Sequence, residues 1–295
     1  MSASEPLGRP ESWPAPGKLN LFLHVVGRRA DGYHRLQTAF QFIDLCDECR
    51  FWQRPPGVVE RVRDLPGVPA ESDLCVRAAR LLASRAPGAA GVAIDVRKRL
   101  PMQGGVGGGS SDAASVLVAL NELWGLRLPA DELAALGLTL GADVPVFVHG
   151  RAAWGEGVGE QLTPVEFPET VYLLIRPDAT VGTADVFKAP ELTRDSAPIK
   201  IRDFLLTGGR NDCEPVVRRR FPAVAEALDW LGQFGPARLT GTGSCVFAAM
   251  PDEERAREVL GRLPERWTGY VVRGLNRSPL LDRLRRERDD GPTGR

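Results

Sequence analysis

A glycine-rich segment at residues 101–114 constrains this chain more than any other part of its sequence. It reads Pro-Met-Gln-Gly-Gly-Val-Gly-Gly-Gly-Ser-Ser-Asp-Ala-Ala, so five residues lack the side chain that keeps an anion away from backbone N–H groups. Residues 92–96 alternate as a strand, and apolar residues at spacings of three and four predict a helix from Ala113 to Trp124. A strand, a glycine loop and a helix N-terminus together favour a bound phosphate.

Two common phosphate-binding patterns do not fit this segment. The P-loop pattern needs Lys and then Ser or Thr after its second glycine, and neither position matches. The dinucleotide pattern G-x-G-x-x-G fails at Ser110, and no acidic ribose ligand follows about 20 residues on, which argues against an oxidoreductase. A flexible linker is the plain alternative, but the flanking predicted strand and helix favour a phosphate site.

The overall composition excludes several classes of protein. Lys and Arg balance Asp and Glu at 38 each, so no net field attracts nucleic acid or a membrane surface. No apolar run approaches the roughly 18 residues of a membrane span, and residues 1–13 lack the layout of a signal peptide, which predicts a cytoplasmic protein. The five cysteines have no framework spacing and are expected to be reduced and structural.

Predicted strands and helices alternate without the regular rhythm of a doubly wound sheet. Strands are predicted at 18–26, in one or two pieces of 36–49, and at 144–148, 172–175, 245–249 and 269–272. Helices are predicted at 74–84, 131–140, 199–206 and 224–234. We expect an α+β fold of two lobes, with the first lobe over residues 1–155, the second over 156–282 and a charged, disordered tail over 283–295.

Four further segments bear on the glycine loop. Residues 14–20 read Pro-Ala-Pro-Gly-Lys-Leu-Asn, and residues 240–244 read Thr-Gly-Thr-Gly-Ser. Residues 29–37 read Arg-Ala-Asp-Gly-Tyr-His-Arg-Leu-Gln, and residues 138–147 read Leu-Thr-Leu-Gly-Ala-Asp-Val-Pro-Val-Phe. Taken in chain order together with the glycine loop, the set resembles the motifs of the small-molecule kinases typified by galactokinase, homoserine kinase and mevalonate kinase, the GHMP kinases. The resemblance implies their two-lobed architecture, with the active site in the cleft between the lobes.

The resemblance implies transfer of a phosphoryl group from ATP, with Mg²⁺, to a hydroxyl of a small molecule. Such a reaction needs charge neutralisation at the phosphates, an aligned hydroxyl and often a base. Asp143 matches the family's base, and Lys18 matches the lysine that holds and polarises the hydroxyl. The resemblance places ATP along Pro101, Met102, Gln103, Gly104, Gly105, Val106, Gly107, Gly108, Gly109, Ser110 and Ser111.

Two details of this nucleotide site stay open in the sequence. Either Ser110 or Ser111 offers a hydroxyl to Mg²⁺, and no acidic metal ligand stands out. Asp112 is a departure, because a carboxylate beside a phosphate site repels it unless a metal intervenes or the side chain turns away. Its simplest role is to cap the helix that follows.

Within the family, the resemblance is closest to the members that act on a cytidine-diphosphate-linked methylerythritol. It implies phosphorylation of the free 2-hydroxyl of that compound, a step of the non-mevalonate route to isoprenoid precursors. Tyr33 and Phe187 are then expected to enclose the cytosine ring, and His34 to select it by hydrogen bonds. Asn20 and Thr183 match the polar contacts near the erythritol and the diphosphate.

Two alternatives remain at this point. A related kinase for homoserine or a mevalonate-type alcohol would not need the segment 31–34 or Phe187 as a platform for a base. A nucleotide-binding relative without catalysis would not need both Lys18 and Asp143.

Overall fold

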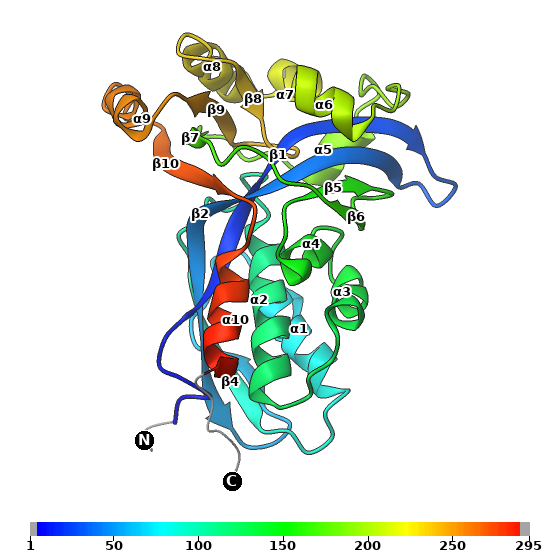
Figure 1. Cartoon of the computed structure of the whole chain (residues 1–295), viewed down its shortest axis with the longest axis vertical. Coiled ribbons are helices and arrows are strands. Elements are labelled where there is room, and N and C mark those ends of the chain that lie inside the picture. The colour runs from blue at the N-terminus through cyan, green and yellow to red at the C-terminus, as the bar shows by residue number, and fades with distance from the viewer. Residues whose placement is uncertain (1–4, 290–295) are drawn as a thin grey trace.

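Two long antiparallel strands, β1 (Trp13–Arg28) and β2 (His34–Arg54), form the spine of the structure, a computed structural model that describes residues 5–289. In Figure 1, β1 runs from the lower lobe to the upper one, and β2 returns from the hairpin turn beside the upper lobe to the lower lobe. A tight turn joins them, because the N–H of Arg29 donates to the Tyr33 carbonyl oxygen at 2.7 Å and Gly32 adopts a φ of +89°. Each lobe is therefore built on a different part of one hairpin.

The ten strands of the described chain form one sheet, in the order β3-β4-β2-β10-β7-β9-β8, while β1 and β5 also pair with β2 and β6 pairs with β5. The remaining strands are β3 (Val59–Arg61), β4 (Gly91–Arg97), β5 (Ala153–Glu156), β6 (Gln161–Pro164), β7 (Val171–Arg176), β8 (Ala237–Leu239), β9 (Val246–Met250) and β10 (Thr268–Leu275). The pairing of β10 with β2 carries the sheet from one lobe to the other.

Helices cover the sheet in both lobes (Figure 1). The lower lobe holds α1 (Leu74–Ala83), α2 (Gly108–Leu123), α3 (Ala130–Leu138), α4 (Val144–His149) and α10 (Pro279–Asp289). The upper lobe holds α5 (Thr183–Lys188), α6 (Ile201–Thr207), α7 (Glu214–Arg220), α8 (Pro222–Leu231) and α9 (Glu253–Leu260). This mixture of helix and strand confirms the predicted α+β fold. No helix within residues 5–289 has the length and apolar character needed to cross a membrane.

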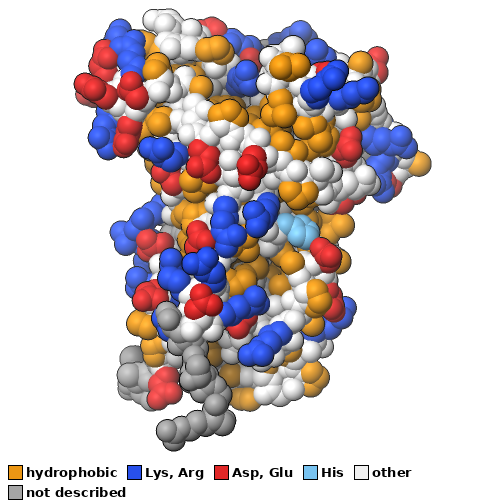
Figure 2. Space-filling view, in the orientation of Figure 1, with side chains coloured by type: hydrophobic (Ala, Val, Ile, Leu, Met, Phe, Trp, Pro, Cys, Tyr) orange, Lys and Arg blue, Asp and Glu red, His pale blue; other side chains and the backbone are white. Residues whose placement is uncertain are grey.

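Three apolar cores hold these elements together. One fills the lower lobe around α2, a second fills the upper lobe, and a third lies between them around Phe22, Trp154 and Phe204. On the face shown in Figure 2, acidic and basic side chains are interspersed over both lobes, as expected for a chain without net charge. All five cysteines are free thiols.

The predicted strand at 144–148 is wrong, because these residues form α4. Pro145 fits the first turn of a helix, where its missing N–H costs nothing, and Gly150 ends the helix with a φ of +62°. An apolar run of this length does not distinguish a buried strand from a buried helix. The helix predicted from Ala113 begins earlier, at Gly108, because Gly107 with a φ of +74° serves as its N-cap.

The predicted disordered tail is wrong for residues 283–289, which belong to α10; residues 290–295 lie outside the described part of the chain. Arg283 is 1% exposed, and its guanidinium carbon lies 4.4 Å from the centre of the Trp13 ring. Leu280 of the same helix is fully buried in the lower core, whereas Leu23 at the far end of β1 is part of the upper core. The ranges 1–155 and 156–282 therefore describe the lobes only in part.

A buried charge cluster holds the start of the glycine loop. The Nζ of Lys98 donates to Asp47 of β2 and, at 2.6 Å, to Asp112 in the first turns of α2. Asp47 also accepts the backbone N–H groups of Arg99 and Leu100, the latter at 2.8 Å. The cluster thereby joins β2, the segment before the loop and the helix after it.

Asp112 does not cap α2, contrary to the simplest expectation from its position. It is 4% exposed, and burial raises its pKa to about 8; the charge of Lys98 opposes this shift and that of Asp47 reinforces it. Two carboxyl groups share one ammonium, so the arrangement without net charge has one of them protonated. With its proton, Asp112 adds no negative charge beside a phosphate site.

Substitutions in this cluster are expected to have unequal effects on stability. Lys98→Met leaves Asp47 and Asp112 without their cation and is expected to lower the free energy of unfolding by about 3–5 kcal/mol. Asp112→Asn keeps the shape of a neutral carboxyl group and is expected to cost less than about 1 kcal/mol at pH 6. Urea unfolding of both variants and the wild type measures the difference. An Asn variant as unstable as the Lys98 variant would show that Asp112 is ionised in the folded chain.

The same cluster predicts a pH dependence. The folded chain keeps the Asp112 proton up to about pH 8, whereas an unfolded chain releases it near about pH 4. The resulting stability is complete below the unfolded pKa and is lost as the pH rises toward the folded one. Thermal unfolding between pH 5 and pH 9 should show this loss in the wild type and a smaller one in Asp112→Asn; parallel profiles would contradict it.

Candidate active site

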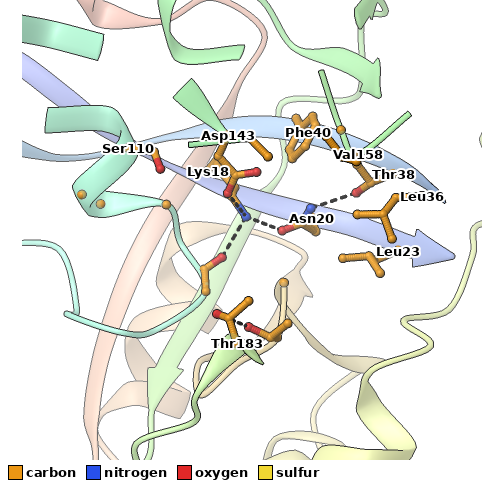
Figure 3. Close-up of a pocket in the computed structure, with 18 of the residues that line it drawn as sticks. Lys18, Asn20, Leu23, Leu36, Thr38, Phe40, Ser110, Asp143, Val158 and Thr183 are labelled. Carbon is orange, nitrogen blue, oxygen red and sulfur yellow. Dashed lines mark hydrogen bonds and ion pairs between the residues drawn. The ribbon is translucent and has the colours of Figure 1, made fainter. Parts of the chain in front are cut away.

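Two adjoining cavities form a continuous cleft along β1. The first has a volume of about 400 Å³ and is lined by β1, the glycine loop and the start of α4 (Figure 3). The second, about 790 Å³, lies toward the turn of the β1–β2 hairpin. Both are lined by Leu36, Ala142, Val158, Thr183 and Phe187. A ligand longer than either cavity can therefore lie across the two.

Lys18 and Asp143 meet in the first cavity (Figure 3). The Lys18 side chain is 3% exposed, and its Nζ lies 3.5 Å from Asp143 Oδ2. The same Nζ donates to the Gly105 carbonyl oxygen at 3.0 Å and to Asn20 Oδ1. Asp143, at the N-terminus of α4, keeps 35% of its side chain exposed. The ammonium is thus fixed by three acceptors, while the carboxylate remains open to a ligand.

Asn20 positions Lys18 through a network of hydroxyl groups. Its Nδ2 donates to Thr38 Oγ1 at 2.8 Å, and its backbone N–H donates to Thr240 Oγ1 at 3.0 Å. Because Nδ2 donates to Thr38, the amide oxygen faces the ammonium. Across the cavity, the hydroxyls of Thr183 and Thr242 lie 3.0 Å apart.

Close packing requires glycine at only some positions of the glycine loop. A Cβ on Gly105, whose φ is +75°, would lie 2.2 Å from the Thr240 carbonyl oxygen, and one on Gly107 would lie 2.8 Å from the Phe147 ring. At Gly108 and Gly109, the nearest atoms would lie 3.5 and 3.6 Å away, which is ordinary contact. These two glycines are not required by packing, yet both line the first cavity.

Gly108 and Gly109 open α2, whose first-turn N–H groups have no intrahelical partner. Without Cβ atoms they let an anion approach these groups and the positive end of the helix dipole. Ser110 lines the same cavity, whereas the Ser111 hydroxyl is buried and donates to the Pro16 carbonyl oxygen at 2.6 Å. Of the two serines, only Ser110 presents its hydroxyl to the cavity.

The outer side of the glycine loop borders a third cavity of about 240 Å³. Its lining includes Pro101, Met102 and Lys98, and the apolar side chains of Leu65, Val68 and Leu74. It shares Gln103, Gly108 and Gly109 with the first cavity, so the α2 N-terminus lies between the two. Val106 faces neither cavity; it is buried in the core between the lobes.

The second cavity is lined by the aromatic side chains that the sequence singled out. The rings of His34 and Phe187 stack with their centres 5.2 Å apart, and Tyr33 on the hairpin turn is 65% exposed. Burial lowers the pKa of His34, and the charges of Arg194 and Arg28 lower it further. This shift favours the neutral imidazole at neutral pH.

Most of the sequence-predicted site residues line the cleft formed by the first two cavities. Pro101 and Met102 line only the third cavity, and Gly104, Val106 and Ser111 are buried and line none of the three. Sequence reasoning missed Thr38, Thr240 and Arg194. Thr240 lies in the motif at residues 240–244, so the sequence offered a signal for it. Arg194 lies in no such motif and is one arginine among many. Within the described chain, no three His, Cys, Asp or Glu side chains group closely enough to hold a metal ion by themselves.

Comparison with known proteins gives consistent matches. Residues 73–151 match the GHMP kinases N terminal domain, and residues 193–269 match the GHMP kinases C terminal family. The 4-diphosphocytidyl-2-C-methyl-D-erythritol kinase of Nitrosococcus oceani is 58% identical over 92% of this chain and 97% of its own length. The enzyme of the same name from Halorhodospira halophila is 60% identical over 91% of this chain and 94% of its own length.

Solved structures agree with these relatives. A crystal structure of 4-(cytidine 5'-diphospho)-2C-methyl-D-erythritol kinase superimposes with a TM-score of 0.76 at 33% identity, covering 90% of this chain and 99% of that one. Mevalonate kinase from Methanococcus jannaschii, at 18% identity, covers 88% of this chain and 97% of its own, and its TM-score of 0.65 shows a shared fold alone. The chain therefore belongs to the GHMP kinase family, in its group of 4-diphosphocytidyl-2-C-methyl-D-erythritol kinases.

Proposed function

We propose that this protein transfers the γ-phosphoryl group of ATP to the free 2-hydroxyl of 4-diphosphocytidyl-2-C-methyl-D-erythritol, in the cytoplasm. The observation that carries the proposal is the Lys18–Asp143 pair, which lies between an exposed helix N-terminus and a cavity with aromatic walls. The relatives from Nitrosococcus oceani and Halorhodospira halophila carry the name of this activity. This reaction is a step of the non-mevalonate route to isoprenoid precursors.

The geometry of the first cavity supports in-line transfer. The Asp143 carboxylate takes the proton of the hydroxyl, whose oxygen forms a bond to the γ-phosphorus as the bond to the β-phosphate oxygen breaks. The Lys18 ammonium, 3.5 Å from Asp143, stabilises the negative charge that develops on the attacking oxygen. The Lys18 side chain is almost fully buried and is hydrogen-bonded to Gly105 and Asn20. Its ammonium group therefore needs little reorganisation during the reaction.

The α2 N-terminus is suited to the phosphates of ATP. Gly108 and Gly109 offer bare N–H groups there, and the third cavity, with its apolar wall, extends from them to receive the nucleoside. When bound together with ATP, Mg²⁺ would neutralise part of the phosphate charge. The Ser110 hydroxyl lines the first cavity beside these N–H groups and would offer the ion one oxygen ligand, while Asp143 stays paired with Lys18.

The second cavity supports the cytidyl end of the substrate. Tyr33 and Phe187 offer aromatic faces for a base, and Thr183 lines both cavities where a diphosphate would join them. A simple alcohol such as homoserine or mevalonate would leave this cavity empty. Its size and lining therefore favour the nucleotide-linked substrate over the alternatives that the sequence left open.

Release of ADP with Mg²⁺–ATP tests the assignment directly. We expect turnover with 4-diphosphocytidyl-2-C-methyl-D-erythritol and none above background with homoserine or mevalonate, since only the first compound fills both cavities. A coupled assay at equal acceptor concentrations measures this. Turnover with either simple alcohol would contradict the assigned substrate, and ATP binding without turnover on any of the three would contradict the kinase assignment.

Removal of the base is expected to slow the chemical step. Asp143→Asn should lower kcat by about 10²–10⁴-fold with little change in either KM, because an amide cannot accept the hydroxyl proton. Lys18→Arg is expected to fail as well, because a planar guanidinium does not fit where an ammonium contacts three acceptors. Asp131→Asn, at a side chain 96% exposed, is the matched control. An Asp143→Asn variant with nearly full kcat would show that another group takes the proton.

A substitution in the glycine loop separates ligand binding from folding. Gly109→Ala meets only ordinary contacts and replaces a helical glycine, so its thermal stability is expected to be unchanged or higher. The added methyl group obstructs the phosphates, and we expect KM for ATP to rise by about tenfold or more, as for one weakened charge-assisted hydrogen bond. Gly261→Ala, at the end of α9, is the control. Loss of stability together with an unchanged KM would assign Gly109 to packing.

A further inference from the structure

Arg194, in the segment between α5 and α6, ties the two walls of the second cavity together. Its Nε donates to His34 Nε2 at 3.1 Å. One terminal nitrogen donates to the carbonyl oxygens of Phe187 at 2.9 Å and Ala189 at 2.7 Å, and the other donates to that of Leu192 at 3.0 Å. The guanidinium thereby holds the C-terminal end of α5 and the His34 ring in one arrangement.

The contact with Arg194 fixes where the proton of His34 lies. A guanidinium only donates hydrogen bonds and keeps its charge, so the Nε2 atom of His34 must accept. In a neutral imidazole, the remaining proton is then on Nδ1. Burial and the cations Arg194 and Arg28 lower the pKa of His34, which keeps the ring neutral, although the carboxylate of Asp31 also lines this cavity.

The Nδ1–H group is available to a ligand. Among residues 5–289, no hydrogen-bond acceptor contacts the Nδ1 atom of His34, and the residue lines the second cavity. Cytosine presents acceptors at N3 and O2, whereas uracil carries a hydrogen at N3. A donor fixed at Nδ1 pairs with N3 of cytosine and opposes N3–H of uracil. A ring free to exchange its proton between the two nitrogens could accept from uracil instead.

We propose that Arg194 is a positioning residue that sets the preference for cytosine, by holding His34 in the form with its proton on Nδ1. The proposal rests on the function assigned above, since it concerns the base of that substrate. Arg194 does not need to touch the substrate; it acts through His34 and, by its contact with the Phe187 carbonyl, through the aromatic wall.

Two measurements on the full chain test this without phosphoryl transfer. The first is ¹⁵N NMR of the imidazole rings in ligand-free protein at pH 7.5; the chain has three histidines, and His34→Gln identifies the signal of His34. We expect a protonated Nδ1 and an unprotonated Nε2 in the wild type. In Arg194→Met, the proton should redistribute toward Nε2, while Arg194→Lys, which keeps a cationic donor, should restore the wild-type pattern in part.

The second measurement compares the affinities for CDP and UDP by titration calorimetry. The wild type is expected to favour CDP by at least about tenfold, the scale of one matched base contact, and Arg194→Met to reduce this ratio toward one. Arg220→Gln is the matched control, because Arg220 binds Glu191 in the same segment and does not contact His34. This control should keep the wild-type ratio and the wild-type NMR pattern.

Several outcomes would overturn the proposal. A wild-type His34 that is protonated at both nitrogens or at Nε2 alone contradicts it, as does an Arg194→Met variant that loses affinity for CDP and UDP equally. A wild type that does not distinguish CDP from UDP also contradicts it. If the wild type prefers CDP but phosphorylates no cytidyl substrate, the kinase assignment fails while the role of Arg194 stands.

Discussion

The backbone of the glycine loop is hydrogen-bonded on both sides, and the rest of the site depends on this. The N–H of Lys18 on β1 donates to the Val106 carbonyl oxygen at 3.0 Å, and the N–H of Cys245 donates to that of Gly104 at 3.1 Å. The loop is therefore clamped between a strand shared by both lobes and a turn of the upper lobe. Its position relative to Lys18 follows from main-chain bonds, and α2 begins in the place where its free N–H groups face Asp143.

Two lysines flank this loop, Lys18 buried and Lys98 partly buried, and their roles differ. Lys98 is paired with two carboxyl groups, and burial raises the pKa of one of them, Asp112, which favours a cluster without net charge that anchors the loop. Lys18 instead shares the cleft with a half-exposed carboxylate, and part of its field reaches the cavity. The chain uses arginine almost everywhere else, and a compact ammonium suits both places because each lysine contacts several oxygen atoms from different elements.

Local patterns in the sequence predicted most of the elements and, with the motifs, the residues of the cleft. Alternation gave the strands at 172–175 and 269–272, and periodicity gave the helices at 74–84 and 224–234, each within a few residues of the structure. One failure was local, because the apolar run at 144–148 fits a buried strand and a buried helix alike, and the others were long-range. The burial of Arg283 depends on Trp13, the state of Asp112 depends on Asp47, and Arg194 meets His34 across 160 positions. No local pattern carries such information, because each of these side chains takes its role from a partner that only the fold brings near.

The shared hairpin has a mechanical consequence. Lys18 and Asn20 lie midway along β1, a single strand that runs from the lower core to Leu23 and Val25 in the upper one, with a shift in its register against β2 on either side of this pair. A hinge at the cleft would have to bend this strand and break its ladder with β2. The lobes are therefore expected to act as one rigid body, so that ligands enter and leave by movement of side chains and loops. For the same reason, the two lobes are expected to unfold together, because each takes part of its core from the same two strands.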